Sequence, residues 1–348
     1  MPLTQVQNGM LAGVIPASLG GTGTTAGVTG FKNRIINGDM TIAQRSVGPV
    51  NNSSAGATLI YDTVDRFGYW AQFANIFSTQ QSSIAPTGFK NSVLITSLAN
   101  TSIASNSYYL YAQRIEGFNM SDLDWGTVNA KTVTFSFWVR SSLTGTFSGY
   151  VFNNGFTYNY PFTYTITTAN TWEQKSITIA GPTAGTWLSN NGIGIEIGLT
   201  LGVGGNYQST ANTWTAGSFA CGSPGSTNLV ATSGATLYTT GWQLEVGSAA
   251  TNFDYLPYGT ELMLCQRYYF QTNGVVYAAA YGSSPSTNSI AQINTPSVMR
   301  TTPTVTLTNS SNGTSFGPGS TCPELIFFTA APTGTGAPRA NMQATAEL

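Results

Sequence analysis

The sequence predicts an all-β protein, a jelly-roll β-sandwich, from its composition, its alternating segments and its turn residues. Only 7% of the 348 residues are charged, against roughly a quarter in ordinary soluble domains. Thr, Val, Ile and aromatic side chains favour pleated sheets, whereas Asn, Gly and Ser favour tight turns. Many short alternating segments between such turns are typical of a sandwich or jelly roll.

The clearest strand is expected within residues 131–140. Four apolar residues alternate with Thr, Ser and Trp in this segment, and we expect them to face the core: Val133, Phe135, Phe137 and Val139. Trp138 then falls on the outer face of the sheet, where a lone tryptophan needs a partner.

A hairpin is expected next, because Asn154-Gly155 is the strongest short signal for a two-residue type I′ turn. The strand after it carries aromatic residues on one parity, from Phe156 to Tyr164, and polar residues on the other. An aromatic stripe can stack on sugars, but the polar opposite parity favours a core position here.

Further strands are expected at Ser176–Ile179, Ile193–Leu199 and Leu237–Val246. In the last of these, alternation places Trp242 towards the core. The same alternation places Gln243 and Glu245 towards solvent.

Four regions are expected along the chain: an extended N-terminal arm at 1–32, the sandwich at 33–256, a short helical connector at 257–270 and a second β-domain at 271–348. The arm contains a Gly/Thr tract that cannot form a core alone. The connector is rich in helix formers, with Thr260 as the expected N-cap and Glu261 in its first turn. The second β-domain has expected strands at Val275–Tyr281, Ser289–Asn294 and Thr304–Thr308.

The composition excludes several classes of function. The net charge is −1 and no run of Lys or Arg occurs, so a nucleic-acid partner is not expected. No histidine is present, which removes His-based nucleophile systems and His-ligated zinc. The three cysteines lack metal-type spacing, and no apolar run approaches the ~18 residues of a membrane span.

Glycoside hydrolysis stays open as an enzymatic alternative, because it needs only two carboxylates at a suitable separation. The thirteen acidic residues are scattered singly. Glu173, Glu196 and Glu245 lie on or beside expected strands, and outward-facing carboxylates of this kind are expected to be solvated or paired with Arg or Lys. We therefore expect a protein that is not an enzyme.

Asp39, Asp62, Asp65 and Asp254 are the residues that could contribute to a Ca²⁺ site, since hard cations prefer clustered oxygens. No dense ligand loop surrounds them. The favoured interpretation is that Asp39 serves its turn and Asp65 pairs with an arginine, so no cofactor is expected and Ca²⁺ is the one ion left open.

Three stretches resemble the sequences of bacteriophage tail-fibre proteins: Asn33 to Arg45, Asp65 to Trp70, and Gly241 to Tyr269. The span 19–270 is also similar to jelly-roll carbohydrate-binding modules. The resemblance implies a homotrimer displayed on a virion and assembled in the host cytoplasm. The N-terminal arm would join it to other tail or capsid proteins, and no membrane insertion is implied.

The function expected from this resemblance is that of a tail fibre or receptor-binding protein that attaches to host surface polysaccharide. Sugars need a flat aromatic face with polar groups around it. The expected glycan-binding residues are Trp187 and Trp214, on loops, and Trp138, for which packing against another subunit is an equal alternative. The second function left open is an architectural virion protein, such as a capsid decoration or fibre spacer, and the third is a glycan depolymerase.

Overall fold

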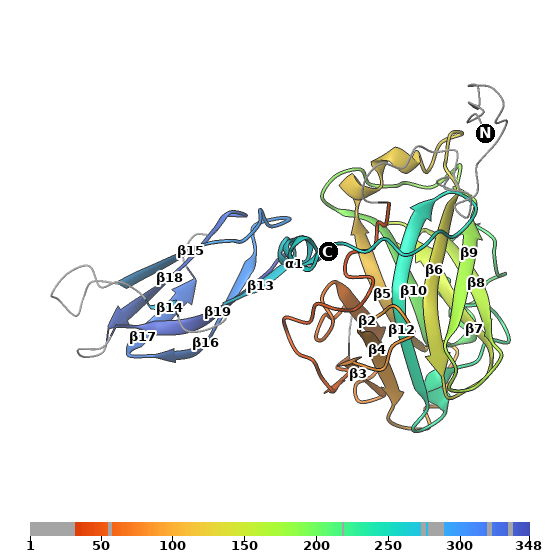
Figure 1. The fold of residues 1–348 in the computed structure, drawn as a ribbon, viewed down its shortest axis with the longest axis horizontal. Coiled ribbons are helices and arrows are strands. Elements are labelled where there is room, and N and C mark those ends of the chain that lie inside the picture. The colour runs from red at the N-terminus through yellow and green to blue at the C-terminus, as the bar shows by residue number, and fades with distance from the viewer. Residues whose placement is uncertain are drawn as a thin grey trace, which may run out of the picture.

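The computed structural model describes residues 32–54, 58–217, 219–272, 276–277, 289–318, 322–332 and 337–348. Nearly all regular structure in these residues is antiparallel β, which confirms the expected all-β class. Figure 1 shows a large sandwich and a smaller group of strands on either side of helix α1 (Tyr258–Gln266). The expected arm at 1–32 lies outside the described residues except for Lys32. No helix of the described part is long and apolar enough to cross a membrane.

The sandwich consists of two six-stranded sheets, and the chain crosses repeatedly from one to the other, as expected for a jelly roll. Sheet A has the order β1 (Val50–Asn51), β3 (Phe77–Ser82), β4 (Ser92–Ser97), β12 (Thr236–Val246), β6 (Val133–Ser141) and β9 (Glu173–Ile179). Sheet B has the order β11 (Thr215–Ala216), β8 (Tyr158–Ile166), β7 (Gly145–Phe152), β10 (Ile193–Val203), β5 (Tyr108–Glu116) and β2 (Phe67–Ala71). The described residues also include four short 3₁₀ turns between strands: Gly117–Asn119, Ser121–Leu123, Gly205–Tyr207 and Leu229–Ala231.

The main core lies between the two sheets and is rich in aromatic rings. Trp242 is completely buried, with its ring centroid 5.1 Å from those of both Phe67 and Phe135. The expected inward residues of β6 are all buried, and so are Tyr160, Phe162 and Tyr164 of β8. The alternation in β6 therefore predicted its core face correctly, and that of the second strand did so from Tyr160 onward, whereas Phe156 and Tyr158 are only half-buried.

The predicted two-residue turn at Asn154-Gly155 is wrong, although the hairpin β7–β8 exists. The last paired residues are Phe152 and Asn159, so the connecting loop is wider. Positive φ angles occur at Gly155 and Phe156. The side-chain oxygen of Asn153 accepts hydrogen bonds from the backbone N–H groups of Thr157 and Tyr158, both at 2.9 Å, and this organises the wider loop.

The outward faces expected to expose Gln243 and Glu245 to solvent are covered, so both residues are buried, and Glu196 is buried too but pairs with Arg114, as one of its two alternatives allowed. The segment after β12 folds back over the first two. Glu245 Oε1 accepts a hydrogen bond from the N–H of Thr251, and Gln243 Oε1 accepts one from the N–H of Asp254, both at 2.8 Å. Strand alternation fixes the sheet face of a side chain but not what covers that face.

The helix begins earlier than expected, at Tyr258, and Pro257 is its N-cap residue. Thr260 lies inside the first turn and makes no cap hydrogen bond, so its predicted capping role is wrong. Pro257 has a fixed φ that suits a helix start. The carboxylate of Glu261 instead accepts a hydrogen bond from the N–H of Asn37.

The strands beyond the helix form two smaller antiparallel sheets. One contains β13 (Tyr269–Gln271), β19 (Arg339–Thr345), β14 (Val276–Tyr277) and β16 (Thr304–Ser311), and the other contains β15 (Ser289–Asn294), β18 (Leu325–Pro332) and β17 (Gly313–Pro318). Their buried core is small and made largely of Ala and Met side chains. The rest of the strand expected at Val275–Tyr281 lies outside the described residues.

The end of the chain returns from β19 to the sandwich, beside α1 (Figure 1). The carbonyl oxygen of Leu348 accepts a hydrogen bond from Arg114 Nη1 of β5 at 2.6 Å. Arg267, directly after α1, pairs with Glu116 of β5 at 2.6 Å. We call this contact region between the sandwich, α1 and the smaller sheets the joint.

Candidate functional site

Two of the predicted glycan-binding residues, Trp187 and Trp214, lie together at one end of the sandwich. The ring centroids of Trp187 and Trp214 are 5.5 Å apart, and Trp214 stacks on Tyr158 at 5.5 Å with an interplanar angle of 13°. Trp125 completes the cluster with edge contacts to both tryptophans. Sequence reasoning did not predict this contact, because the two loops are joined only by the fold.

The indole N–H groups of this cluster are all used inside the protein. Trp187 Nε1 donates to the carbonyl of Ala184 at 3.0 Å, and Trp214 Nε1 donates to that of Ala180 at 2.7 Å. Both side chains also pack against the main core. The arrangement gives Trp187 and Trp214 a packing role, and their contact with a glycan stays a prediction.

Trp138 lies in a different environment, on the outer face of sheet A. Phe89 and Trp138 both lie next to Gly241, in the irregular part of β12. A Cβ atom at Gly241 would lie 3.0 Å from Trp138 Cδ1 and 2.7 Å from Phe89 Cζ. The glycine, with φ of +64°, therefore makes room for the two rings to approach each other.

The rings around Trp138 form a larger set, which we call the aromatic strip: Trp138, Phe89, Phe253, Tyr255, Tyr238 and Trp172. Phe89, Phe253 and Tyr255 contact one another with centroid distances of 4.8–5.6 Å. On the other side, Trp172 and Tyr238 are 6.2 Å apart. Tyr255 is exposed and the other five side chains are half-buried, and a group of aromatic rings at the surface is a typical binding site.

Polar side chains accompany the strip. Arg140 pairs with Tyr238 across β6 and β12, with its guanidinium 5.0 Å from the centre of that ring. Gln174 is exposed and lies opposite Trp138 on β9. Aromatic faces flanked by amide and guanidinium donors are the groups that sugar rings and hydroxyls require.

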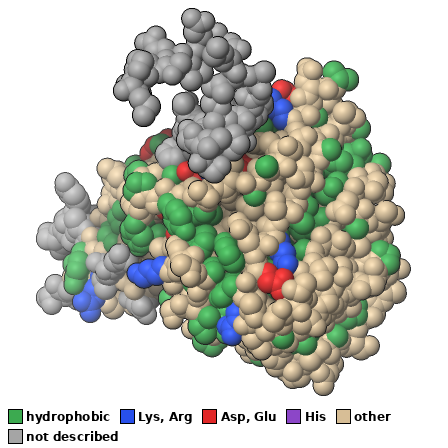
Figure 2. Space-filling view, turned by 45° about the vertical axis from the view of Figure 1, so that its right-hand side comes forward, with side chains coloured by type: hydrophobic (Ala, Val, Ile, Leu, Met, Phe, Trp, Pro, Cys, Tyr) green, Lys and Arg blue, Asp and Glu red, His purple; other side chains and the backbone are tan. Residues whose placement is uncertain are grey.

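The surface of the described residues is largely uncharged. Figure 2 shows broad areas of neutral side chains with isolated blue and red ones between them. A neutral polar surface of this kind loses little hydration energy when it meets an uncharged ligand.

The acidic residues considered for catalysis are engaged in structural contacts. Glu196 accepts hydrogen bonds from Trp70 at 2.9 Å and Tyr150 at 3.0 Å, and it pairs with Arg114 at 2.8 Å. Burial and the Glu196 charge raise the pKa of the Tyr150 phenol well above its usual range, so this phenol stays a donor. Glu173 accepts hydrogen bonds from the N–H groups of residues 167 and 168.

The aspartates considered for Ca²⁺ bind protein groups. Asp39 accepts hydrogen bonds from the N–H and the hydroxyl of Thr41. Asp254 accepts one from the N–H of Lys32 at 2.9 Å. Within the described residues, no group of three His, Cys, Asp or Glu side chains is arranged to hold a metal ion.

No protein-family model matches this sequence, and no curated protein is significantly similar to it. Solved structures with a weak likeness include bacteriophage CBA120 tailspike protein 4, at 11% identity and a TM-score of 0.33, over 58% of this chain and 22% of the tailspike. A putative sugar binding protein from Bacteroides thetaiotaomicron has 11% identity and a TM-score of 0.36, over 62% of this chain and all of its own. The family 22 carbohydrate binding module of Clostridium thermocellum Xyn10B has 11% identity and a TM-score of 0.31, over 54% and 91%. At these scores the likenesses carry no information about a ligand.

Proposed function

We propose that this chain is a non-enzymatic glycan-binding protein and that the aromatic strip on sheet A is its contact surface. The observation that supports this proposal is a group of six aromatic side chains, Tyr255 exposed and the other five half-buried, next to Arg140 and Gln174. Trp138 and Tyr238 lie on strands of sheet A, where side chains lose little conformational entropy on binding, which favours stacking against sugar faces.

The particular setting we propose is the virion of a tailed bacteriophage, where the chain would serve as a tail fibre or receptor-binding protein. This part of the proposal is supported by the sequence resemblance of 33–45 and 241–269 to phage tail-fibre proteins. A homotrimer attached through its N-terminal arm would present three strips to one cell surface. Several weak contacts then act together, because binding of the first raises the effective concentration of the others.

Binding of the purified full-length protein to an array of bacterial surface polysaccharides tests the proposal. We expect the substitutions Trp138→Ala and Tyr238→Ala each to weaken binding by about tenfold, the equivalent of about 1.4 kcal/mol. Phe73→Ala, which removes an exposed aromatic ring outside the strip, is the matched control and should bind like the parent. Equal binding by the parent and both strip variants would reject the strip as the contact surface.

The same array separates the alternatives. If the folded full-length protein binds no polysaccharide, the architectural role is the better explanation. If it releases new reducing ends from a bound polysaccharide with sustained turnover, the non-enzymatic reading is rejected in favour of a depolymerase.

A further inference from the structure

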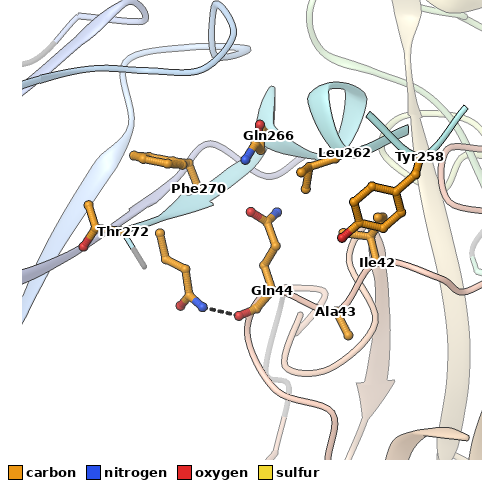
Figure 3. Close-up of a pocket in the computed structure, with 9 residues that line it drawn as sticks. Ile42, Ala43, Gln44, Tyr258, Leu262, Gln266, Phe270 and Thr272 are labelled. Carbon is orange, nitrogen blue, oxygen red and sulfur yellow. Dashed lines mark hydrogen bonds between the residues drawn. The ribbon is translucent and has the colours of Figure 1, made fainter. Parts of the chain in front are cut away.

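A pocket of about 580 Å³ opens at the joint, on the side where the sandwich, α1 and β13 meet. Its volume lies within the roughly 300–1,000 Å³ typical of small-molecule sites. The lining residues come from three separate parts of the chain: residues 42–44 of the sandwich, Tyr258, Leu262 and Gln266 of α1, and residues 270–272 at and after β13. Figure 3 shows the side chain of Gln44 extending from its loop towards the helix.

None of the lining residues is charged. The polar groups are three glutamine amides and the hydroxyls of Thr272 and Tyr258, and the remaining walls are apolar. A charged ligand would find no compensating charge in this pocket, and an entirely apolar ligand would leave the amides without partners. The composition therefore selects for a ligand that is uncharged and rich in hydrogen-bonding groups.

Part of the polar lining is held in place by the protein. Gln271 Nε2 donates to the carbonyl of Gln44 (Figure 3), and Gln271 Oε1 accepts a hydrogen bond from the hydroxyl of Tyr269 at 3.0 Å. Gln44 Nε2 donates to the carbonyl of Tyr269 at 3.0 Å and to the carboxylate of Asp65. These bonds fix the floor of the pocket before any ligand arrives, which lowers the entropy cost of binding.

Other polar groups of the lining have no partner among the described residues. They are the amide of Gln266, the hydroxyl of Tyr258 and the oxygen Oε1 of Gln44, for which no protein hydrogen bond occurs. The lining thus offers free donors and free acceptors from both the helix and the sandwich loop. Vicinal hydroxyl groups, each a donor and an acceptor, match such a mixed set.

The ring of Tyr258 is 62% exposed at the edge of this pocket. A tyrosine with so much free surface can lay its face against the apolar face of a sugar ring while its hydroxyl bonds a neighbouring group. We propose that the joint pocket binds one neutral sugar unit, independently of the aromatic strip. The proposal shares its ligand class with the proposed function but none of its residues, so the two can fail separately.

A ligand in this pocket touches the sandwich, the helix and the smaller sheets at once. It therefore links parts of the chain that otherwise meet through the ion pairs of the joint, and it binds only when they are in contact. By mass action, such a ligand raises the midpoint of thermal unfolding as its concentration rises.

Saturation-transfer NMR on the full-length protein, with glucose, galactose and N-acetylglucosamine as separate probes, tests this site. We expect transfer to at least one of them, and we expect both Gln266→Ala and Tyr258→Ala to weaken its binding by about tenfold. Met263→Ala, which changes an exposed residue of the same helix outside the pocket lining, is the matched control. Trp138→Ala should leave this binding unchanged while it weakens binding to the strip.

The proposal would be overturned by no transfer to any neutral sugar, by transfer that survives both pocket substitutions in the Trp138→Ala background, or by preferential binding of glucuronic acid over glucose. Binding of an uncharged peptide in place of every sugar would reject the ligand class as well. If Trp138→Ala loses polysaccharide binding but keeps monosaccharide binding, the joint pocket is a sugar site separate from the aromatic strip.

Discussion

The carboxylate of Glu347 lies 2.9 Å from the guanidinium of Arg45, 302 positions earlier in the chain. Its second oxygen pairs with Arg66, and the two guanidinium groups cover the rings of Tyr269 and Tyr268 at 3.7 and 3.5 Å. The last residues of the described chain are thus bound to the sandwich by buried charges. These ion pairs therefore fix the relative positions of the sandwich and the smaller sheets, and with them the walls of the pocket.

We expect Glu347→Gln to destabilise the joint strongly, because Arg66 is only 1% exposed and would lose its charge partner. Removing one member of a buried pair typically costs about 3–5 kcal/mol. Urea unfolding followed by tryptophan fluorescence measures the effect. Glu324→Gln, at an exposed acid with no ion pair in the described residues, should change the free energy of unfolding little, and equal effects of both would contradict the prediction.

Gly38→Ala should weaken the packing of the N-terminal segment on β12. A Cβ atom at residue 38 would lie 2.2 Å from the carbonyl oxygen of Trp242, so the backbone must move at a cost of about 1–3 kcal/mol. Gly259→Ala is the matched control: nothing lies within 4 Å of its Cβ, and alanine favours the helix by up to ~1 kcal/mol. We expect the thermal midpoint to fall in Gly38→Ala and to rise in Gly259→Ala. An unchanged midpoint in Gly38→Ala would count against this contact.

The stability of the joint should fall as the pH rises from about 4.5 to about 7. Burial raises the pKa of Glu261 from 4.5 to about 7, while the hydrogen bond from Asn37 opposes this shift and the nearby Asp39 and Asp254 add to it. The folded state therefore holds the proton that the unfolded state releases, and ionisation above pH 7 works against folding.

Glu261→Gln keeps a hydrogen-bond acceptor without the charge, so it should stabilise the protein at pH 8 by about 1–2 kcal/mol after allowance for partial exposure. At pH 4 the same substitution should have little effect. Urea unfolding of parent and variant at both pH values provides the measurement. If the free energies of unfolding of parent and variant differ by the same amount at both pH values, Glu261 does not titrate in this range.

Trp242→Ala should remove much of the stability of the sandwich, since the side chain is completely buried between the two sheets. Its indole N–H also donates to Thr239 Oγ1 at 2.7 Å. Substitutions of this size in a core cost about 3–5 kcal/mol. Trp138→Ala, at a partly exposed ring, should cost far less. Differential scanning calorimetry of the two variants measures this, and equal losses of stability would contradict the prediction.

The sequence determined the sheet-forming segments and much of the core. The alternation in β6 and β8 places side chains on one sheet face through local geometry alone, and the buried residues there agree with it. The composition determined the neutral surface in the same direct way. These properties depend on residues close together in the chain.

Only the tertiary structure decided which side chains remain accessible. Trp187 and Trp214 were both expected on open loops, yet the fold packs them together with Trp125, whereas Trp138, equally half-buried, lies on the outer face of sheet A. Glu196 is buried because Trp70, Arg114 and Tyr150 gather around it from three other strands. The joint pocket combines residues 42–44 with 258–272, and no local pattern predicts such a contact, because it depends on how distant segments are brought together by packing.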